Sequence, residues 1–413
     1  IKSGIRLRYV TTPRKVYHKY YNVISNPLLW FHQHYVWNSP YGPNVNSDIH
    51  NAWAEGYVEV NKAFAKSIVD EIRSIPDSNR PVVMIHDYHL YLVAGYVKSE
   101  IPKSKISHFV HIPWPSARYW KFLPTYITKA ICQSLCSADI VGFQTHDDVL
   151  SFLQTCYEFL PDVRVDYDKT LINIGGRQVA VRSYPISIDV DEIRNISISK
   201  HAMDYESYIR NICKQYAIVR VDRAEPSKNI LRGFRAYALL LSKHKELLGK
   251  VTFLAFLVPS RSHIRQYKKY MDDIKQIIDD INNTYGYQGW SPIEAFYENN
   301  YTQALAGLKL YDVLLVNSVI EGMNLISKQG AVVNANSGVI VLSETTGAYS
   351  ELYTAVLGIS PSDVEGTMQA MYQALNMSPE ERKSKSLAVS KIVERGDIYR
   401  WLYTQLDDIK SVS

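Results

Sequence analysis

Residues Val319–Gln329 read Val-Ile-Glu-Gly-Met-Asn-Leu-Ile-Ser-Lys-Gln, and they join an apolar run to a helical pattern. The apolar run, Asp312–Val316, is typical of a buried strand. A strand that turns into a helix leaves backbone N–H groups without helical partners, and these groups bind the oxygen atoms of anionic ligands. Gly322 permits a ligand to approach the backbone closely. The stretch therefore predicts an α/β fold with a ligand at this turn.

An earlier strand end carries two cations. The segment Val221–Asn229 reads Val-Asp-Arg-Ala-Glu-Pro-Ser-Lys-Asn, in which Arg223 and Lys228 stand close together. The plain interpretation is a solvated, charged turn. The functional one is that both cations neutralise a diphosphate, an effect that grows as water is excluded. Because α/β sheets bind ligands at the carboxyl ends of their strands, the glycine turn and the cation pair together predict a site for a phosphorylated ligand.

The bulk composition is that of an ordinary globular protein. A chain of 413 residues is too long for one typical core and predicts two domains of about 200 residues each. The net charge of +5 is spread along the chain without a dense basic tract, so it suits anionic small ligands and does not favour nucleic acid. No apolar stretch reaches the roughly 20 residues that a membrane span requires.

The spacing of the cysteines indicates the cellular compartment, and the first residue bears on where the natural chain starts. The four cysteines have neither zinc-ribbon nor disulfide-framework spacing, and they are Cys132, Cys136, Cys156 and Cys213. They predict buried free thiols and a reducing cytoplasm. The chain begins at Ile1, without methionine or a secretory signal, so we expect the natural start to precede this numbering.

Short apolar runs alternate with longer helical patterns, which predicts βαβ units around parallel sheets. The strands predicted in the first half are Val82–Ile85, Ser107–His111 and Ile140–Phe143, then a hairpin of Leu171–Ile174 and Val179–Arg182 around Gly175 and Gly176. Those predicted in the second half are Ala217–Val221, Thr252–Val258, Val313–Val316 and Val339–Leu342. The predicted helices are Ala52–Ile72, Val149–Leu160, Asn229–His244, Ile264–Tyr285 and Ile398–Ile409, and another begins at a capping box of Ser378 and Glu381. This order predicts two doubly wound domains, with Tyr184–Asp189 as the exit from the first.

Two strand ends in the first half carry polar side chains that suit a sugar. Asp87 can accept hydrogen bonds from sugar hydroxyls, and His111 can bind a hydroxyl or stabilise charge. Tyr21 and Trp30 lie in an aromatic segment that can pack against a sugar ring. The plain alternatives are polar groups satisfied at loop edges and, for the aromatic side chains, core packing.

Two further candidates lie in the second half. Arg261 follows a predicted strand and suits bidentate recognition of a phosphate, although a surface arginine is the plain alternative. Glu321, in the glycine turn, can reach the hydroxyls of a sugar ring. The sequence lacks the tight acidic cluster expected around a phosphate-bound magnesium ion, so we predict no protein-held metal.

These pieces, in this order, resemble the trehalose-6-phosphate synthase family of retaining glycosyltransferases, from about Tyr20 to the C-terminus. The matching motifs are Tyr-Tyr-Asn with Leu-Trp, His-Asp-Tyr-His-Leu, His-Ile-Pro-x-Pro, Val-Asp-Arg with Ser-Lys, Pro-Ser-Arg, Gly-Trp-x-Pro and Gly-Met-Asn-Leu. The resemblance implies a GT-B fold, with two Rossmann-like, doubly wound α/β domains facing across a cleft. It implies an acceptor domain over 1–195, a nucleotide-sugar domain over 196–390 and a helix over 391–413 that crosses back. The family's first strand and glycine-rich loop would precede Ile1.

The resemblance also implies an activity. A glucosyl group would move from a nucleotide sugar, UDP-glucose or GDP-glucose, to glucose 6-phosphate, giving α,α-trehalose 6-phosphate with retention at the anomeric carbon. The leaving phosphate would accept the acceptor's proton on the same face, so no side-chain nucleophile is needed. The nucleotide sugar is a co-substrate, and no cofactor is expected. The expected partners are small molecules, without nucleic acid or membrane, and a homo-oligomer stays open.

Site residues carry over from the family by position. Those that would bind the donor are Arg223, Lys228, Glu321, Gly322, Met323, Asn324, Leu325, Gln329 and His111. Those that would bind the acceptor are Tyr21, Trp30, Asp87 and Arg261. The catalytic residues would be Arg223, Lys228, His111 and Asp87.

Three departures from the family pattern leave alternatives open. Gln329 stands where the family has a glutamate that binds the ribose hydroxyls of the nucleotide, and Glu321 replaces an aspartate. The stretch Trp114–Trp120 looks more like relatives that make glucosylglycerol phosphate, or like pseudo-glycosyltransferases that join aminocyclitols. The alternatives are therefore another phosphorylated acceptor, another donor nucleotide, or a catalytically idle homologue that senses sugar phosphates.

Overall fold

The computed structural model describes residues 4–36, 44–76, 81–261 and 265–412. The chain forms two compact units, each with its own sheet. Unit 1 comprises Ile1–Tyr184 and Tyr403–Ser413, and unit 2 comprises Pro185–Leu402. The division falls inside the segment predicted as the exit from the first domain. The predicted fold class, α/β with two mostly parallel, Rossmann-like sheets, is confirmed.

The sheet of unit 2 is parallel throughout its described strands, in the order β12-β11-β10-β7-β8-β9. These strands are β7 (Tyr216–Arg223), β8 (Val251–Val258), β9 (Ile293–Phe296), β10 (Val313–Val316), β11 (Val339–Ser343) and β12 (Leu357–Ile359). From β7 the chain winds outward through β8 to β9, then returns to β10 on the other side of β7. The order therefore reverses between β7 and β10, and such a reversal opens a crevice at the carboxyl ends of the two strands.

Both faces of this sheet are apolar, which is why its strands read as continuous hydrophobic runs. Successive side chains of a strand point to opposite faces. In β10, Val313 and Leu315 therefore pack in one core, and Leu314 and Val316 pack in the other. Each fully buried Val or Leu side chain contributes roughly 1.5–3 kcal/mol, so both faces must be covered by helices.

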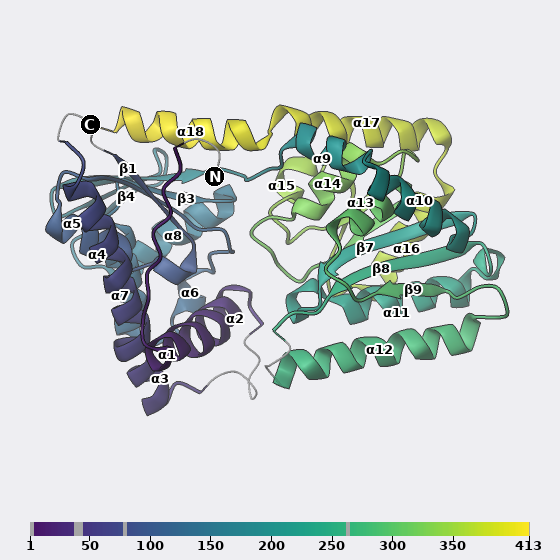
Figure 1. Ribbon diagram of the computed structural model, residues 1–413, viewed down its shortest axis with the longest axis horizontal. Coiled ribbons are helices and arrows are strands. Elements are labelled where there is room, and N and C mark those ends of the chain that lie inside the picture. Colours follow the sequence, from purple (N-terminus) through teal and green to yellow (C-terminus); the bar gives the residue numbers. More distant parts are fainter. Residues whose placement is uncertain (1–3, 37–43, 77–80, 262–264, 413) are drawn as a thin grey trace. The chain divides into compact units, whose positions relative to one another are not determined.

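Two layers of helices cover the sheet of unit 2. One layer consists of α9 (Val190–Ser197), α10 (Lys200–Ile212), α13 (Tyr301–Leu310), α14 (Leu325–Val333) and α17 (Pro379–Arg395). The other consists of α11 (Ile230–Lys243), α12 (Arg265–Tyr285) and α16 (Val364–Asn376). Figure 1 shows α10 and α13 on one side of the sheet and α11 and α12 on the other. Shorter helical elements are η5 (Pro226–Lys228), η6 (Lys245–Leu247) and α15 (Tyr349–Leu352).

The sheet of unit 1 has the order β1-β2-β3-β6-β5-β4. Its strands are β1 (Val82–His86), β2 (Lys105–Phe109), β3 (Ile140–Phe143), β4 (Arg164–Asp166), β5 (Leu171–Ile174) and β6 (Arg177–Ser183). The first three strands and β6 are parallel, whereas β5 runs antiparallel to both of its neighbours. The predicted hairpin is confirmed: Gly175 and Gly176 have φ angles of 56° and 74°, which a two-residue turn of this type requires.

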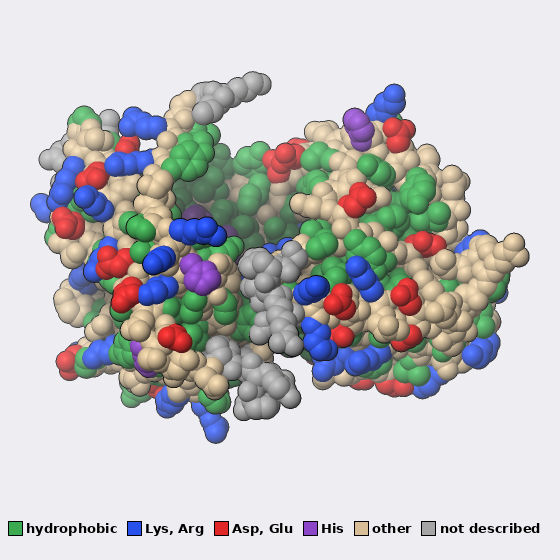
Figure 2. Space-filling model, turned by 60° about the horizontal axis from the view of Figure 1, so that its bottom comes forward, with side chains coloured by type: hydrophobic (Ala, Val, Ile, Leu, Met, Phe, Trp, Pro, Cys, Tyr) green, Lys and Arg blue, Asp and Glu red, His purple; other side chains and the backbone are tan. Residues whose placement is uncertain are grey.

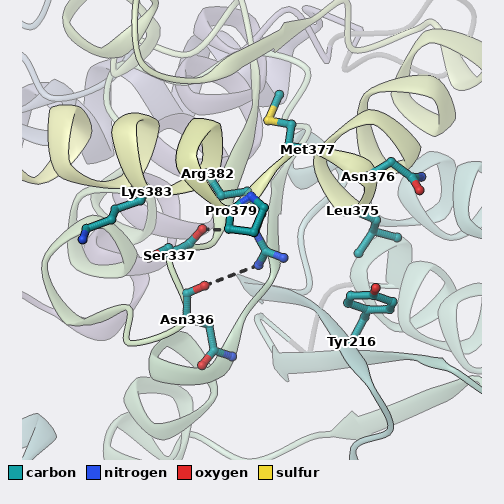
Figure 3. Close-up of a pocket in the computed structure, with 9 residues that line it drawn as sticks. All are labelled: Tyr216, Asn336, Ser337, Leu375, Asn376, Met377, Pro379, Arg382 and Lys383. Atoms are coloured by element: carbon teal, nitrogen blue, oxygen red, sulfur yellow. Dashed lines mark hydrogen bonds between the residues drawn. The ribbon is translucent and has the colours of Figure 1, made fainter.

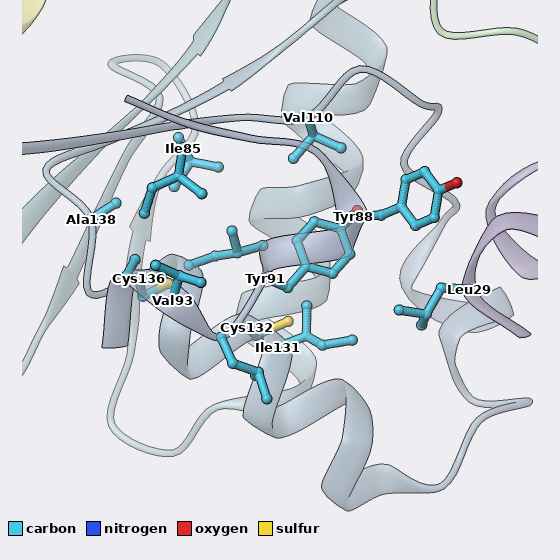
Figure 4. Close-up of a cluster of buried hydrophobic side chains, with 14 of the residues drawn as sticks. Leu29, Ile85, Tyr88, Tyr91, Val93, Val110, Ile131, Cys132, Cys136 and Ala138 are labelled. Carbon is cyan, nitrogen blue, oxygen red and sulfur yellow. The ribbon is translucent and has the colours of Figure 1, made fainter. Parts of the chain in front are cut away.

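The helices of unit 1 surround a single core. They are α1 (Arg14–Tyr17), η1 (His18–Trp30), α2 (Phe31–Gln33), α3 (Ser47–Ala52), η2 (Trp53–Val58), α4 (Glu59–Arg73), η4 (Tyr88–Leu90), α5 (Val93–Glu100), α6 (Ala117–Trp120), α7 (Thr125–Leu135) and α8 (His146–Phe159). Figure 4 shows Ile85 of β1, Val93 of α5 and Ile131 of α7 packed in this core. Of the four cysteines, all free, Cys132, Cys136 and Cys156 are buried here as predicted, and Cys213 is half-buried.

Most predicted elements are confirmed, with shifted ends. The capping box is present, since Ser378 and Glu381 bond reciprocally at the start of α17. The predicted strand Ser107–His111 is wrong at its end, because β2 stops at Phe109 and His111 lies in the following loop. The strands β4, β9 and β12 were not predicted, because their sequences, Arg-Val-Asp, Ile-Glu-Ala-Phe and Leu-Gly-Ile, are short and contain no continuous apolar run. Ile264, the predicted first residue of α12, lies outside the described residues.

The last helix, α18 (Ile398–Ser411), is divided between the units after Leu402. Within unit 1, the Tyr184 hydroxyl donates to Asp408 at 2.6 Å. Within unit 2, the Ile398 N–H donates to the Ile188 carbonyl at 3.1 Å, and the Tyr399 hydroxyl donates to Asp189 at 2.8 Å. The helix start is therefore attached to the segment by which the chain first enters unit 2.

Two surface properties follow from the described residues. On the face drawn in Figure 2, Lys and Arg side chains lie among Asp and Glu side chains, in keeping with the spread of charge along the sequence. None of the described helices is both long and apolar enough to cross a membrane.

Candidate functional site

The carboxyl ends of β7 and β10 bring together the two motifs singled out in the sequence. Arg223 is the last residue of β7, Lys228 ends the short helix η5, and Glu321 follows β10. The Lys228 ammonium donates to a Glu321 carboxylate oxygen at 2.6 Å. Both predicted donor-binding motifs therefore lie at the point where the strand order reverses, which is where sheets of this kind bind nucleotides.

The Lys228–Glu321 pair is charged and largely shielded from solvent, with side chains 15% and 8% exposed. Burial alone would raise the pKa of Glu321, but the Lys228 ammonium and hydrogen bonds from Ser318 and Asn324 outweigh it, so the pKa lies below its ordinary value. Burial would likewise lower the pKa of Lys228, but Glu321 and Asp222 raise it. Both directions keep the pair ionised. The sequence analysis predicts that Glu321 binds sugar hydroxyls. In the structure its carboxylate also binds the Lys228 ammonium.

The glycine turn leads into α14 as predicted. Asn324 is the N-cap of this helix, and its side chain accepts from the Ser327 N–H at 2.8 Å. The turn containing Gly322, Met323 and Leu325 thus presents the start of a helix, with its backbone N–H groups, at the carboxyl edge. Farther along α14, the Gln329 side-chain oxygen is buried and has no hydrogen-bond partner among the described residues.

One further lysine of α14 ties this helix to the chain entering unit 2. Lys328 is buried, and its ammonium donates to the Ile186 carbonyl at 2.8 Å and to Glu351 at 2.6 Å. Burial lowers the pKa of Lys328, and the Glu351 carboxylate opposes that shift. Lys328 therefore has a structural role that the motif alone did not show.

A buried arginine, Arg220, holds the backbone turn that carries Lys228. The Arg220 guanidinium donates to Asp222 at 2.7 and 3.0 Å and to the Lys228 carbonyl at 3.0 Å. It also lies over the Phe234 ring, 5.6 Å from the centroid. These contacts fix the turn that carries Lys228. Sequence reasoning missed this role, although a charged pair inside an apolar strand was its signal.

In unit 1, Asp87 and His111 come together. Asp87 follows β1 with a φ of 71°, an uncommon angle for a residue other than glycine. Its carboxylate accepts from the His111 backbone N–H at 3.1 Å. Burial raises the pKa of Asp87 to about 6 even though backbone N–H groups oppose that shift. A strained, half-buried carboxylate with a raised pKa at a strand end is typical of a binding site.

His111 is held as a neutral hydrogen-bonding group. Its Nε2 atom lies 3.0 Å from Nδ1 of His86, the last residue of β1. Burial, with a smaller contribution from His86, lowers the pKa of His111 to about 4. At neutral pH, His111 can therefore contact a hydroxyl without carrying a positive charge. Of the two roles predicted for it, binding a hydroxyl and stabilising charge, the neutral ring fits the first.

The aromatic candidates differ in exposure. Tyr21 and Trp30 both lie in η1. Trp30 is 4% exposed and stacks on His34 with ring centroids 4.1 Å apart, which is core packing. Tyr21 is half-buried and stacks on His89 at 5.8 Å. Tyr21 lies beside the His-Asp-Tyr-His segment that holds Asp87, and the acceptor role of both aromatic residues stays a prediction.

Arg261 lies just beyond the carboxyl end of β8, as predicted. Its φ is 44°, and its guanidinium donates to the Tyr267 hydroxyl and lies over that ring, 5.4 Å from the centroid. β8 is the neighbour of β7 in the sheet, so Arg261 and Arg223 belong to the same edge of unit 2. The structure thus places all the predicted sites of unit 2 at one edge.

A pocket of about 580 Å³ lies at the opposite edge of the sheet, where Tyr216 begins β7 and Asn336 and Ser337 precede β11. Figure 3 shows Arg382 pointing toward the carbonyl groups of Asn336 and Ser337. Its guanidinium also donates to Asp312 at 2.6 Å, so this cation is neutralised within the fold. The pocket therefore lies away from the carboxyl edge, where the predicted ligand-binding residues of unit 2 are found.

Metal-ligating side chains do not gather in the described part of the chain: no group of three or more His, Cys, Asp or Glu residues there is placed to hold a metal ion.

Comparisons with known proteins agree with this geometry. The model of glycosyltransferase family 20 matches residues 1–411. The chain is 31% identical to an alpha,alpha-trehalose-phosphate synthase [UDP-forming] of Pichia angusta, over 92% of this chain and 78% of that one. It is similarly 31% identical to a trehalose-6-phosphate synthase of Cronobacter sakazakii, over 96% of this chain and 80% of that one.

Solved structures give the same result. An E. coli trehalose-6-phosphate structure bound with UDP-2-fluoro glucose has a TM-score of 0.87 at 28% identity, covering 97% of this chain and 86% of that one. An alpha,alpha-trehalose-phosphate synthase (UDP-forming) from Burkholderia xenovorans, in complex with glucose-6-phosphate, has a TM-score of 0.85 at 26% identity, covering 96% of this chain and 85% of that one.

Proposed function

The chain belongs to glycosyltransferase family 20, and from this membership we propose that it transfers a glucosyl group from UDP-glucose to glucose 6-phosphate. The products are α,α-trehalose 6-phosphate and UDP. The predicted family, the GT-B fold and the class of nucleotide-sugar-dependent glycosyltransferase are confirmed. The Pichia angusta relative is a UDP-forming synthase, and solved structures of similar proteins contain a UDP-glucose analogue or glucose 6-phosphate, which supports the choice of substrates.

The observation that carries the proposal is the placement of Arg223, Lys228 and the Glu321 turn at the reversal point of the strand order. Two cations and a helix start there suit a diphosphate leaving group. As the glycosidic bond to the diphosphate breaks, negative charge grows on its oxygen atoms. Fixed cations stabilise that charge without reorganising, and this is where most of the rate enhancement arises.

The transfer proceeds without a protein nucleophile. The acceptor hydroxyl forms its bond to the anomeric carbon on the face that the diphosphate leaves, which retains the configuration. Its proton passes to an oxygen atom of the departing phosphate, so the enzyme needs no separate base. His111, neutral at the working pH, contacts the donor sugar, and Asp87 accepts from acceptor hydroxyls. Orientation and charge stabilisation together carry the catalysis.

A substrate panel tests the proposal. Purified protein is incubated with UDP-, GDP- or ADP-glucose and with glucose 6-phosphate, glycerol 3-phosphate or glucose, and the products are identified by mass and by anomeric NMR signals. We expect a disaccharide phosphate with retained configuration from UDP-glucose and glucose 6-phosphate. Nucleotide binding without any product would instead support the idle, sugar-phosphate-sensing alternative.

Gln329 favours a second candidate function, a synthase that binds the nucleotide more weakly or uses another nucleotide. Its buried side-chain oxygen is free of partners among the described residues, so a glutamate there would add charge to an existing acceptor position. We expect Gln329→Glu to lower the KM for UDP-glucose by about tenfold, because charge-assisted hydrogen bonds to ribose hydroxyls are stronger. Steady-state kinetics with the three nucleotide sugars measure this. Unchanged KM values for all three would refute a ribose contact.

Arg261 provides the test of acceptor binding. We expect Arg261→Ala to raise the KM for glucose 6-phosphate by roughly 10- to 100-fold while leaving the KM for UDP-glucose nearly unchanged, because one charged contact with the phosphate is lost. Arg261→Lys should recover only part of the loss, because an ammonium cannot bind two phosphate oxygens in parallel. With glucose as acceptor, variant and wild type should be alike. Equal effects on both KM values would contradict the assignment.

A further inference from the structure

Glu225 is a buried carboxylate that the proposed reaction does not yet use. It follows β7 two residues after Arg223, and its side chain is 1% exposed. One of its oxygen atoms, Oε1, accepts from the Ser260 hydroxyl at 2.8 Å. The same oxygen lies 3.3 Å from Nη1 of Arg223. A single atom thus contacts two separate segments at the carboxyl edge of unit 2.

In the proposed function, the two segments that Glu225 contacts bind different substrates. Arg223 belongs to the proposed diphosphate site, and Ser260 immediately precedes Arg261, the proposed ligand of the acceptor's phosphate. Their strands are already neighbours, since Arg223 pairs with Val258 in the sheet and the Ala224 N–H donates to the Val258 carbonyl at 2.8 Å. Beyond these backbone bonds the strands have ended, so the side chain of Glu225 is what continues the connection.

The charges of this region act on one common group. Burial raises the pKa of Tyr267 to about 12; Arg261 and Arg223 oppose that rise, and Glu225 adds to it. Two guanidinium groups and one carboxylate therefore lie within electrostatic range of one hydroxyl. Two cations gathered to bind phosphates repel each other before the substrates arrive, and a fixed carboxylate close to them reduces that repulsion.

Folding stability does not account for this carboxylate. Its second oxygen, Oε2, is buried and has no hydrogen-bond partner among the described residues. A buried carboxylate oxygen without a partner destabilises a fold, so such a group in a native structure needs another explanation. Arg223 is 58% exposed on its side chain, and a pair with so exposed a partner stabilises little. A functional role explains both observations.

We propose that Glu225 is a positioning residue that holds Arg223 and the Ser260–Arg261 segment in a fixed relation, so that the donor diphosphate and the acceptor phosphate are bound in register. The inference rests on the proposed function and adds a residue that touches neither substrate. Misplacing reacting groups by about 1 Å can slow transfer roughly 100-fold, so a rigid link between the two phosphate-binding cations has a direct effect on rate.

Three variants separate the two contacts. Ser260→Ala removes only the contact to the Arg261 segment and should raise the KM for glucose 6-phosphate by about tenfold, with the KM for UDP-glucose unchanged. Glu225→Gln keeps an oxygen for Ser260 but loses the charge facing Arg223, so it should raise the KM for UDP-glucose by about tenfold. Glu225→Ala removes both contacts and should raise both KM values and lower kcat.

The matched control is Glu298→Gln, the same chemical change at an exposed glutamate in the loop after β9, and it should behave as wild type. A merely structural role would lower the melting temperature and the titrated fraction of active enzyme while leaving both KM values unchanged, and that result would overturn the proposal. Wild-type KM values in both Ser260→Ala and Glu225→Gln would overturn it too. Should Glu225→Ala fail to fold, these two milder variants still decide the question.

Failure of the proposed function is recognised separately. If the wild-type protein makes no product from UDP-glucose and glucose 6-phosphate, the function is wrong whatever the variants do. Calorimetry with UDP as the probe then tests the positioning role alone. Weaker UDP binding by Glu225→Gln than by wild type and Glu298→Gln would support that role, and equal binding by all three proteins would reject it.

Discussion

Lys228→Ala is expected to reduce kcat/KM for UDP-glucose by roughly 10³-fold, the largest effect of any single substitution in unit 2. In the proposed function Lys228 binds the diphosphate where negative charge develops, and its ammonium is already held in place by Glu321. The same change also leaves the Glu321 carboxylate buried without its cation, because the pair is only 15% and 8% exposed. Breaking such a pair from one side destabilises the fold by about 3–5 kcal/mol.

The two effects of Lys228→Ala can be separated. The double variant Lys228→Met with Glu321→Gln removes both charges and keeps the side-chain volumes, so it should recover most of the melting temperature but none of the turnover. Arg223→Ala should affect turnover without the loss of stability expected for Lys228→Ala. Arg223 is more than half exposed, so its loss should leave stability nearly unchanged while turnover falls steeply. Wild-type kinetics in either single variant would contradict the diphosphate role.

Asp87→Asn is expected to stabilise the unliganded protein at pH 7 while it reduces kcat/KM for glucose 6-phosphate. Burial raises the pKa of Asp87 from 3.8 to about 6, which corresponds to roughly 3 kcal/mol. Between these values the folded state binds a proton that the unfolded state has lost, so stability falls as pH rises from about 4 to 6. Above pH 6 the charged carboxylate destabilises the fold by the full amount, and an uncharged amide removes that penalty.

The loss of function in Asp87→Asn has a separate cause. A carboxylate accepts charge-assisted hydrogen bonds from acceptor hydroxyls, and an amide oxygen accepts weaker ones, so kcat/KM should fall by roughly 10- to 100-fold. Asparagine tolerates the positive φ of this position, so backbone strain does not confuse the comparison. Melting curves at pH 4 and pH 7, with kinetics at pH 7, check both parts. A melting temperature at pH 7 no higher than that of wild type would contradict the buried-charge argument.

Much of this fold could be predicted from local patterns. The glycine turn after β10 and the cations after β7 were visible because each stands where an apolar run ends. The capping box of Ser378 and Glu381 is a local signal of the same kind. Such features depend on residues close in sequence, and a single sequence shows them directly.

The parts that could not be predicted depend on contacts between distant residues. Nothing local shows that Lys228 pairs with Glu321, or that Glu225 accepts from Ser260. The burial of Trp30 is likewise set by the packing of other elements around it. The positive φ of Asp87 and the hydrogen bond from the His111 N–H to its carboxylate also depend on residues far apart in the sequence. Tertiary packing determines these features, and a local pattern of residue types does not reveal them.

The attachment of α18 to the entry of unit 2 has a mechanical consequence. The chain crosses between the units twice, near Pro185 and near Leu402, and the hydrogen bonds Ile398 to Ile188 and Lys328 to Ile186 anchor both crossings to unit 2. Both connections therefore leave unit 2 at points that hydrogen bonds within unit 2 hold in place, so neither connecting segment can shift along that unit without breaking a bond.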